Sequence, residues 1–196
     1  MQLFSHPEEH VSLELSRLCA RVVDYLGIEY EPSHIIFDNN DYLKIPDIID
    51  EFRDAAFFWT PERPKNKVPL YLGEIMSDPK CTHLIWLSHS VLSSSDMSFV
   101  WVLAHELRHV FQSRNEVLYG HIKRKIREIR REQYYFNLPS FLFDPSEIDA
   151  ELCALRTLED IYNEGAQVFL DAGSLRRCPL PQYAQLLKRV SIECLN

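Results

Sequence analysis

The stretch from residue 97 to about residue 114 restricts the fold of this chain more than any other part of the sequence. It reads as a helix that begins after the N-capping candidates at 93–96. A helix that is apolar on most sides has to be buried. The remainder of the 196 residues must therefore enclose it, and a hydrophobic content of 46% is sufficient for such a core. Its apolar side chains are Trp101, Val102, Leu103, Ala104, Leu107, Val110 and Phe111.

The same helix carries three polar side chains in an H-E-x-x-H pattern. His105 and His109 are four residues apart, so they lie on one helix face and their imidazoles can converge on one Zn²⁺. Glu106 follows His105 directly and can act as the general base toward water. The alternative is that both histidines bond to backbone at the edge of the core, with Glu106 and Arg108 on the solvated face. The pattern favours a site for one zinc ion.

Such a site needs a third protein ligand. Gln112 and Asn115 stand where the metzincin pattern has a glycine and a third histidine, which argues against that arrangement. The next acidic segment, at 144–151, offers Glu147 as the expected ligand, and Asp149 and Glu151 remain alternatives.

The start of that acidic segment also has a purely structural interpretation. Asp144 at the N-cap, Pro145 at the first helical position and Glu147 at the third form a capping box, which competes with metal binding for one carboxylate. Glu151 lies one turn beyond Glu147 and could accept the free N–H of a ligand histidine.

Residues 103–112 and 147–151 resemble the zincin metallopeptidases with a glutamate ligand, the gluzincins, and among these most the ImmA/IrrE-type family. In gluzincins a downstream helix carries Glu-x-x-Ala followed by an acid or amide, and 147–151 fits that frame. The resemblance implies that His105 and His109 bind the metal, that Glu106 is the catalytic residue and that Glu147 is the third ligand.

The resemblance also implies a zincin-like α+β fold. It has an N-terminal helix, a small mixed or antiparallel sheet, the active-site helix and a C-terminal helical part. In that family the strand before the active-site helix is an edge strand, a role that 82–87 would fill here. An extended peptide substrate could add to its free edge by backbone pairing.

Periodicity predicts the remaining elements. An amphipathic helix starts near Pro7 and ends just before Gly27, and a strand-like run at 28–37 is broken at Pro32. Strands cover 68–75 and 82–87, and a short helical segment follows Pro46. Further helices cover 144–163 and 182–194. We find no repeat and no convincing linker, so we expect one domain over 1–196.

A basic helical insert at about 116–143 separates the two halves of the metal site. Six basic residues fall within 120–131, and Ile122, Ile126 and Ile129 share one face that can dock on the domain. The simplest interpretation of the basic side chains is a solvated face. The functional interpretation is a platform for an acidic partner, DNA or an acidic substrate segment.

The overall charge and the cysteines limit which partners and which cellular compartment we expect. With 21 basic and 29 acidic residues, the net charge of −8 disfavours a general nucleic-acid binder. Five cysteines without a C-x-x-C pair disfavour a disulfide framework. The start lacks a signal-peptide pattern, and no apolar run could span a bilayer. We therefore expect a cytoplasmic protein without membrane attachment.

Together these features predict a zinc-dependent metallopeptidase that hydrolyses a protein or peptide substrate, with room for a regulatory protein partner. Two alternatives come from other classes. One is a non-catalytic interaction module that uses the metal for stability, and the other is a regulator that binds a repressor or nucleic acid through the basic helix. The donor to the oxyanion stays open among Tyr119, His121, Tyr134, Tyr135 and Tyr162.

Overall fold

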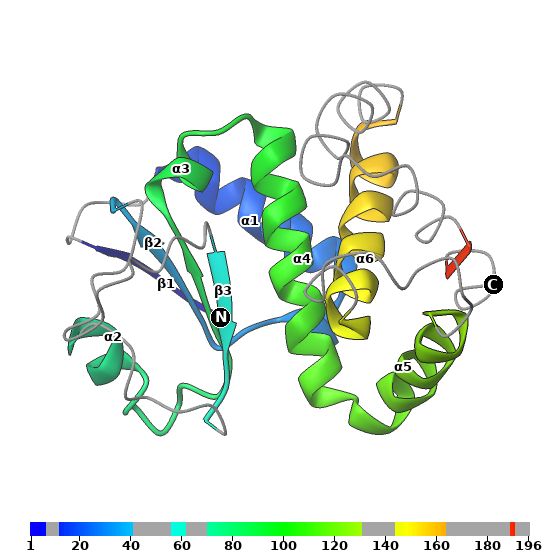
Figure 1. The fold of residues 1–196 in the computed structure, drawn as a ribbon. Coiled ribbons are helices and arrows are strands. Elements are labelled where there is room, and N and C mark those ends of the chain that lie inside the picture. The colour runs from blue at the N-terminus through cyan, green and yellow to red at the C-terminus, as the bar shows by residue number, and fades with distance from the viewer. Residues whose placement is uncertain (7–11, 41–55, 62–69, 131–143, 164–188, 191–196) are drawn as a thin grey trace, which may run out of the picture. The chain divides into compact units, whose positions relative to one another are not determined.

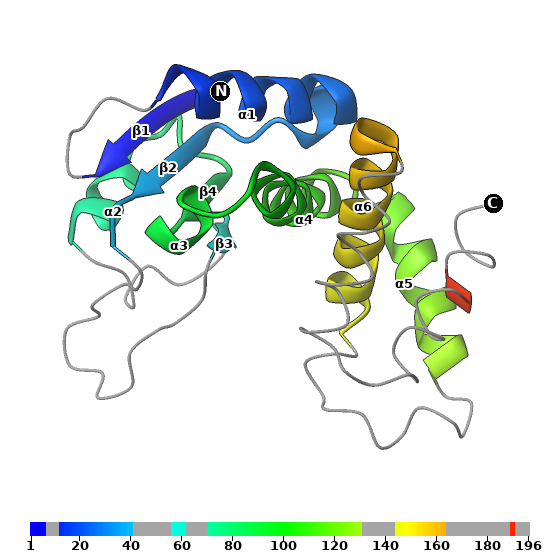
Figure 2. The same ribbon diagram turned by 90° about the horizontal axis from the view of Figure 1, so that it is seen from above.

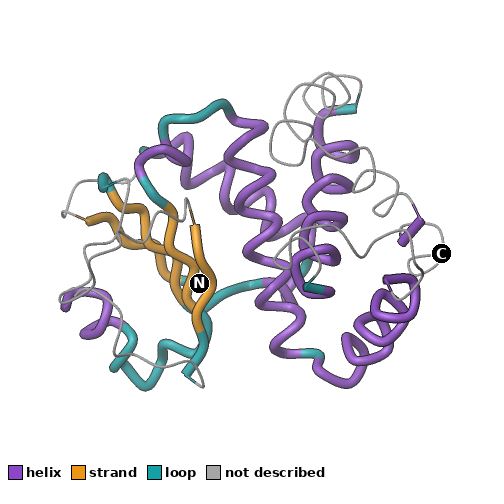
Figure 3. Tube along the Cα trace, viewed as in Figure 1, coloured by secondary structure: helices purple, strands orange, loops and turns teal. Residues whose placement is uncertain are grey.

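The computed structural model describes residues 1–6, 12–40, 56–61, 70–130, 144–163 and 189–190 (Figure 1). These residues form helices and one four-stranded sheet, which confirms the α+β class (Figure 3). The chain divides into two compact units, Met1–Val110 and Phe111–Asn196. The boundary falls inside helix α4 (Asp96–Arg114), which is continuous across it.

The sheet lies in the first unit and has the order β1-β2-β4-β3. Strands β1 (Gln2–His6), β2 (His34–Asp38) and β4 (Leu84–Leu87) are parallel, as the arrowheads of β1 and β2 show in Figure 2. Strand β3 (Ala56–Trp59) runs antiparallel to β4. The sheet is therefore mixed, as expected.

The position of β4 corrects one expectation. The strand that precedes the H-E-x-x-H helix was expected at an edge, but β4 pairs with β2 on one side and β3 on the other. Among the described strands, β3 is the edge next to β4. The sequence prediction missed β3 because a short apolar run without alternation cannot be told from the end of the helical segment expected after Pro46. Its pairing is supported by Phe57, which stacks on Trp86 with ring centroids 5.6 Å apart.

The N-terminal region also differs from the prediction. Helix α1 (Leu13–Leu26) begins after Ser12, whose side chain accepts a hydrogen bond from the Leu15 backbone N–H, and not at Pro7. Strand β1 precedes it and was not predicted. The helix ends at Gly27, as expected, and Gly27 has a φ of 97°. A single 3₁₀ turn, η1 (Ile28–Tyr30), then leads to β2, so only the second half of the predicted strand 28–37 is extended.

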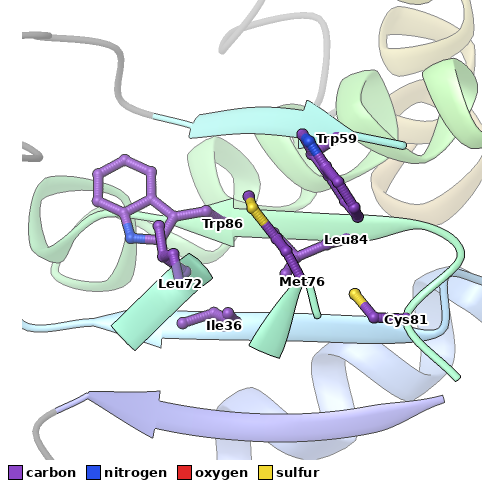
Figure 4. Packing of buried hydrophobic residues seen from close by; sticks show 7 residues of the cluster. All are labelled: Ile36, Trp59, Leu72, Met76, Cys81, Leu84 and Trp86. Atoms are coloured by element: carbon purple, nitrogen blue, oxygen red, sulfur yellow. The ribbon is translucent and has the colours of Figure 1, made fainter. Parts of the chain in front are cut away.

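The strand predicted at 68–75 is wrong. Residues Leu70–Ile75 form helix α2. Leu72 and Met76 belong to one hydrophobic cluster, and Tyr71 and Ile75 pack against the same cluster. In a strand, neighbours such as Tyr71 and Leu72 would point to opposite faces, whereas a helix puts all four on one side. Figure 4 shows this cluster, and its members come from α2, the following loop and three strands: Ile36, Trp59, Leu72, Met76, Cys81, Leu84 and Trp86.

The sheet is buried on both faces. Ile36 and Trp86 face the α2 cluster, whereas the alternate residue Phe37 packs edge-on against Phe99 of α4, with centroids 6.3 Å apart. Central strands buried on both faces carry continuous apolar runs, and β4 is such a run. A short helix, α3 (His89–Leu92), links β4 to α4.

The second unit contains the end of α4 with α5 (Glu116–Arg130) and α6 (Pro145–Tyr162). Ile126 and Ile129 of α5 are buried, as the predicted docking face requires, and Ile122 is half-buried. The rest of the insert, 131–143, lies outside the described residues, as do nearly all of the helix predicted at 182–194 and most of the segment after Pro46. None of the helices in the described ranges combines the length and apolar character needed to cross a membrane.

Candidate metal centre

Helix α4 forms where the sequence predicted it and is buried as expected. Its first turn is capped by Ser95, whose hydroxyl oxygen accepts from the Ser98 backbone N–H at 3.3 Å. One stripe of the helix is completely buried and consists of Val100, Leu103, Ala104, Leu107 and Val110. This packing holds the remaining face of α4, which carries the histidines, in a defined orientation.

The two histidines lie next to each other on that face. His105 and His109 are both half-buried, and their ring centroids are 5.0 Å apart in an edge-to-face arrangement. Phe58 of β3 stacks on the His109 ring with a centroid distance of 6.1 Å. Phe58 is itself buried, so it limits the rotation of the His109 ring. The histidine pair therefore lies beside strand β3.

Glu106 and Arg108 are buried, with exposures of 8% and 7%. The alternative that placed them on a solvated face is wrong for these two residues. The guanidinium of Arg108 donates to the Tyr30 hydroxyl at 2.5 Å and lies over the Tyr30 ring, which explains how its charge is accommodated. Burial of Glu106 places a carboxylate in a low-dielectric environment directly after the first histidine.

Helix α6 starts at the predicted cap. Asp144 is the N-cap residue and Pro145 follows at the first helical position. The Asp144 carboxylate accepts from the backbone N–H of Ser146 at 2.8 Å and from its hydroxyl at 2.5 Å. The cap bond therefore goes to Ser146. Glu147 comes next and is half-buried in the first turn.

Among the described residues, the structure brings together one group that could hold a metal ion. His105, His109 and Glu147 each offer one ligand atom, and these atoms all lie within 4.8 Å of one another. Two imidazoles and one carboxylate match the donor set of zinc sites that keep a coordination position open. Two neighbouring histidines on a mostly buried helix, with an acid in reach, fit a divalent cation chemically.

The alternative ligands are not part of this group within the described residues. Asp149 is 2% exposed, and its Oδ2 accepts a hydrogen bond from Gln112 Nε2 at 2.9 Å. Glu151 is half-buried. Sequence reasoning treated Gln112 only as a departure from another pattern and missed this contact. The available signal was an amide side chain three residues after His109, on the same helix face.

Tyr119 is the described tyrosine that stands out among the oxyanion candidates. Its hydroxyl is buried near Ser146 but makes no hydrogen bond of ordinary geometry to any described residue. Burial raises the pKa of Tyr119, and the nearby carboxylates of Asp149 and Asp144 raise it further. His121 is exposed and Tyr162 half-buried, while Tyr134 and Tyr135 lie outside the described residues. The donor to the oxyanion therefore stays open.

Comparisons with protein-family models, with curated proteins and with solved structures find no significant match to this chain.

Proposed function

We propose that this protein is a zinc-dependent metallopeptidase of the glutamate-ligand type, in which His105, His109 and Glu147 bind one Zn²⁺. The observation that carries the proposal is the approach of these three ligand atoms to within 4.8 Å of one another. Their spacing in the sequence and the resemblance of 103–112 and 147–151 to the ImmA/IrrE-type family support the same assignment.

The chain's own residues would divide the chemistry as follows. When bound, Zn²⁺ acts as a Lewis acid on a peptide carbonyl and makes water more acidic. Glu106 takes the proton from the attacking water and delivers it to the leaving amine nitrogen. Its burial limits competing bulk water and strengthens the electrostatic interactions of its carboxylate.

The substrate we propose is an extended peptide that pairs with the outer edge of β3. Within the described residues, β3 has β4 as its one neighbour, so its other edge can accept a strand. Phe58 of β3 stacks on His109, and a peptide along that edge would therefore run past the histidine pair. This moves the substrate edge from residues 82–87, where the sequence put it, to Ala56–Trp59.

Helix α5 supports a second candidate function, the binding of a regulatory protein with an acidic surface. Its basic residues Arg124, Lys125 and Arg127 are exposed, in a chain whose net charge is −8. Val117, at the start of α5, is 83% exposed and adds an apolar contact. Binding by this helix should weaken with added salt and on neutralising Lys123, Arg124 and Lys125.

The decisive variant for the peptidase is Glu106→Gln. The purified wild-type chain should contain about one Zn²⁺, as expected for a site with three ligands. It should cleave members of a synthetic peptide library, followed by mass spectrometry. Glu106→Gln should retain the metal and lose cleavage by at least about 100-fold, because the amide cannot accept the proton.

Glu128→Gln on the exposed face of α5 is the matched control and should cleave like the wild type. A wild-type chain that binds no zinc, or a Glu106→Gln variant that cleaves normally, would contradict the proposal. If the metal serves only stability, Glu106→Gln stays fully functional while His105→Ala lowers the melting temperature.

A further inference from the structure

We propose that Gln112 is a positioning residue that holds Glu147 in place for metal binding. This rests on the proposed zinc site and adds to it a residue outside the H-E-x-x-H pattern. In this proposal Gln112 acts through the first turn of α6, which carries Glu147.

The side-chain amide of Gln112 makes two hydrogen bonds to that turn. Its Nε2 donates to the backbone oxygen of Ser146 at 3.0 Å and to Oδ2 of Asp149 at 2.9 Å. An amide nitrogen carries two hydrogens, so both are used. Ser146 immediately precedes Glu147 and Asp149 follows it by two residues. The backbone that carries Glu147 is therefore held on both sides.

Both partners are protected from water. Gln112 is 6% exposed and Asp149 is 2% exposed. In such surroundings a hydrogen bond to a carboxylate is strong and directional, because water does not compete for it. Removal of the Gln112 amide would take one hydrogen-bond donor from the buried Asp149 carboxylate, and this loss would destabilise the folded state. This buried contact therefore fixes the position of the first turn of α6 relative to Gln112.

The place of Gln112 on α4 connects this contact to the histidines. It lies three residues after His109 and seven after His105, and residues at these spacings share one face of a helix. Helix α4 is continuous from Asp96 to Arg114. The turn that Gln112 binds is thus held one helical turn beyond His109, on the face that carries both imidazoles.

The test is the affinity for Zn²⁺, measured by competition with a chromophoric chelator. Gln112→Met keeps the length of the side chain and removes both hydrogen bonds. The variant should bind Zn²⁺ about 10- to 100-fold more weakly than the wild type, the usual loss when a residue that orients a ligand is removed. The metal-free variant should keep the wild-type helix content by circular dichroism. Glu128→Met on the exposed face of α5 is the control and should bind normally.

Exchanging the donor and the acceptor between positions 112 and 149 separates positioning of Glu147 from a general loss of packing. Gln112→Glu places a second carboxylate against Asp149 and should weaken zinc binding at least as much as Gln112→Met. Adding Asp149→Asn restores one hydrogen bond with donor and acceptor exchanged, so the double variant should bind zinc more tightly than Gln112→Glu alone. This comparison also decides the matter if Gln112→Met does not fold.

The outcomes distinguish this inference from the proposed function. A wild-type chain without measurable Zn²⁺ affinity contradicts the zinc site and the inference with it. Tight binding by the wild type together with an equal affinity of Gln112→Met, or a double variant no better than Gln112→Glu, overturns the role of Gln112 and leaves the zinc site standing.

Discussion

Buried polar side chains in this protein differ in whether they are satisfied. Asp38, at the end of β2, is completely buried and accepts from Trp86 Nε1 at 2.9 Å and from the backbone and side-chain nitrogens of Asn40 at 2.8 Å. The Tyr71 hydroxyl also donates to it. These four donors offset the cost of burying a carboxylate. Tyr119 is the contrast, because its buried hydroxyl lies near Ser146 but makes no hydrogen bond of ordinary geometry to any described residue.

This contrast predicts opposite effects for two tyrosine variants. Tyr119→Phe should raise the free energy of unfolding by about 1 kcal/mol, because it removes an unsatisfied buried hydroxyl. Tyr71→Phe should lower it by about 1–3 kcal/mol, because it takes a donor from a buried charge. Urea unfolding of the metal-free proteins measures both. Equal losses in the two variants would mean that the Tyr119 hydroxyl has a partner after all.

At the scale of single elements, packing decided what local pattern left ambiguous. The run at 68–75 suggested a strand, but Leu72 and Met76 lie in the cluster shown in Figure 4, and Tyr71 and Ile75 pack against it too. Adjacent residues of a strand would point to opposite faces, so this pattern requires a helix. Strand β3 is short, and its identity depends on pairing with β4. Helices α4 and α6 carry their own caps and apolar faces and were predicted closely, whereas only the end of α1 was predicted correctly.

Two glycines give a prediction for helix α5 and the end of α1. A Cβ added at Gly120, inside α5, would meet nothing within 4 Å, so Gly120→Ala should stabilise the protein by about 0.5–1 kcal/mol. Gly27 also has free space, but its φ of 97° is strained for alanine, so Gly27→Ala should destabilise by about 1 kcal/mol. Thermal unfolding measures both. A stabilised Gly27→Ala variant would contradict the described end of α1.

At the scale of the whole molecule, the proposed site joins residues distant in the chain. His109 and Glu147 are separated by 37 residues that include all of α5. A ligand that binds only the folded state stabilises it by mass action, and a metal held by the proposed site would link both segments to this effect.

Zinc should therefore change global stability. Added Zn²⁺ at 100 times its dissociation constant should raise the free energy of unfolding by about 2.7 kcal/mol, and a chelator should reverse this. Calorimetry with and without chelator measures the change. His105→Ala should abolish the dependence on zinc, whereas Glu106→Gln should keep it. A melting temperature of the wild type that ignores both zinc and chelator would argue against a folded-state metal site.

The sequence by itself determined the features that depend on local chemistry and helical period. The burial of α4, the shared face of His105 and His109 and the cap at Asp144 follow from residue types and spacings of three and four. The sequence favoured Glu147 as third ligand but left Asp149 and Glu151 open. Only the tertiary structure decided that β4 is central, that β3 is the edge and that Gln112 reaches Asp149. Strand order and contacts between helices depend on segments far apart in the chain, and the local spacing of residues does not show which of these segments come into contact.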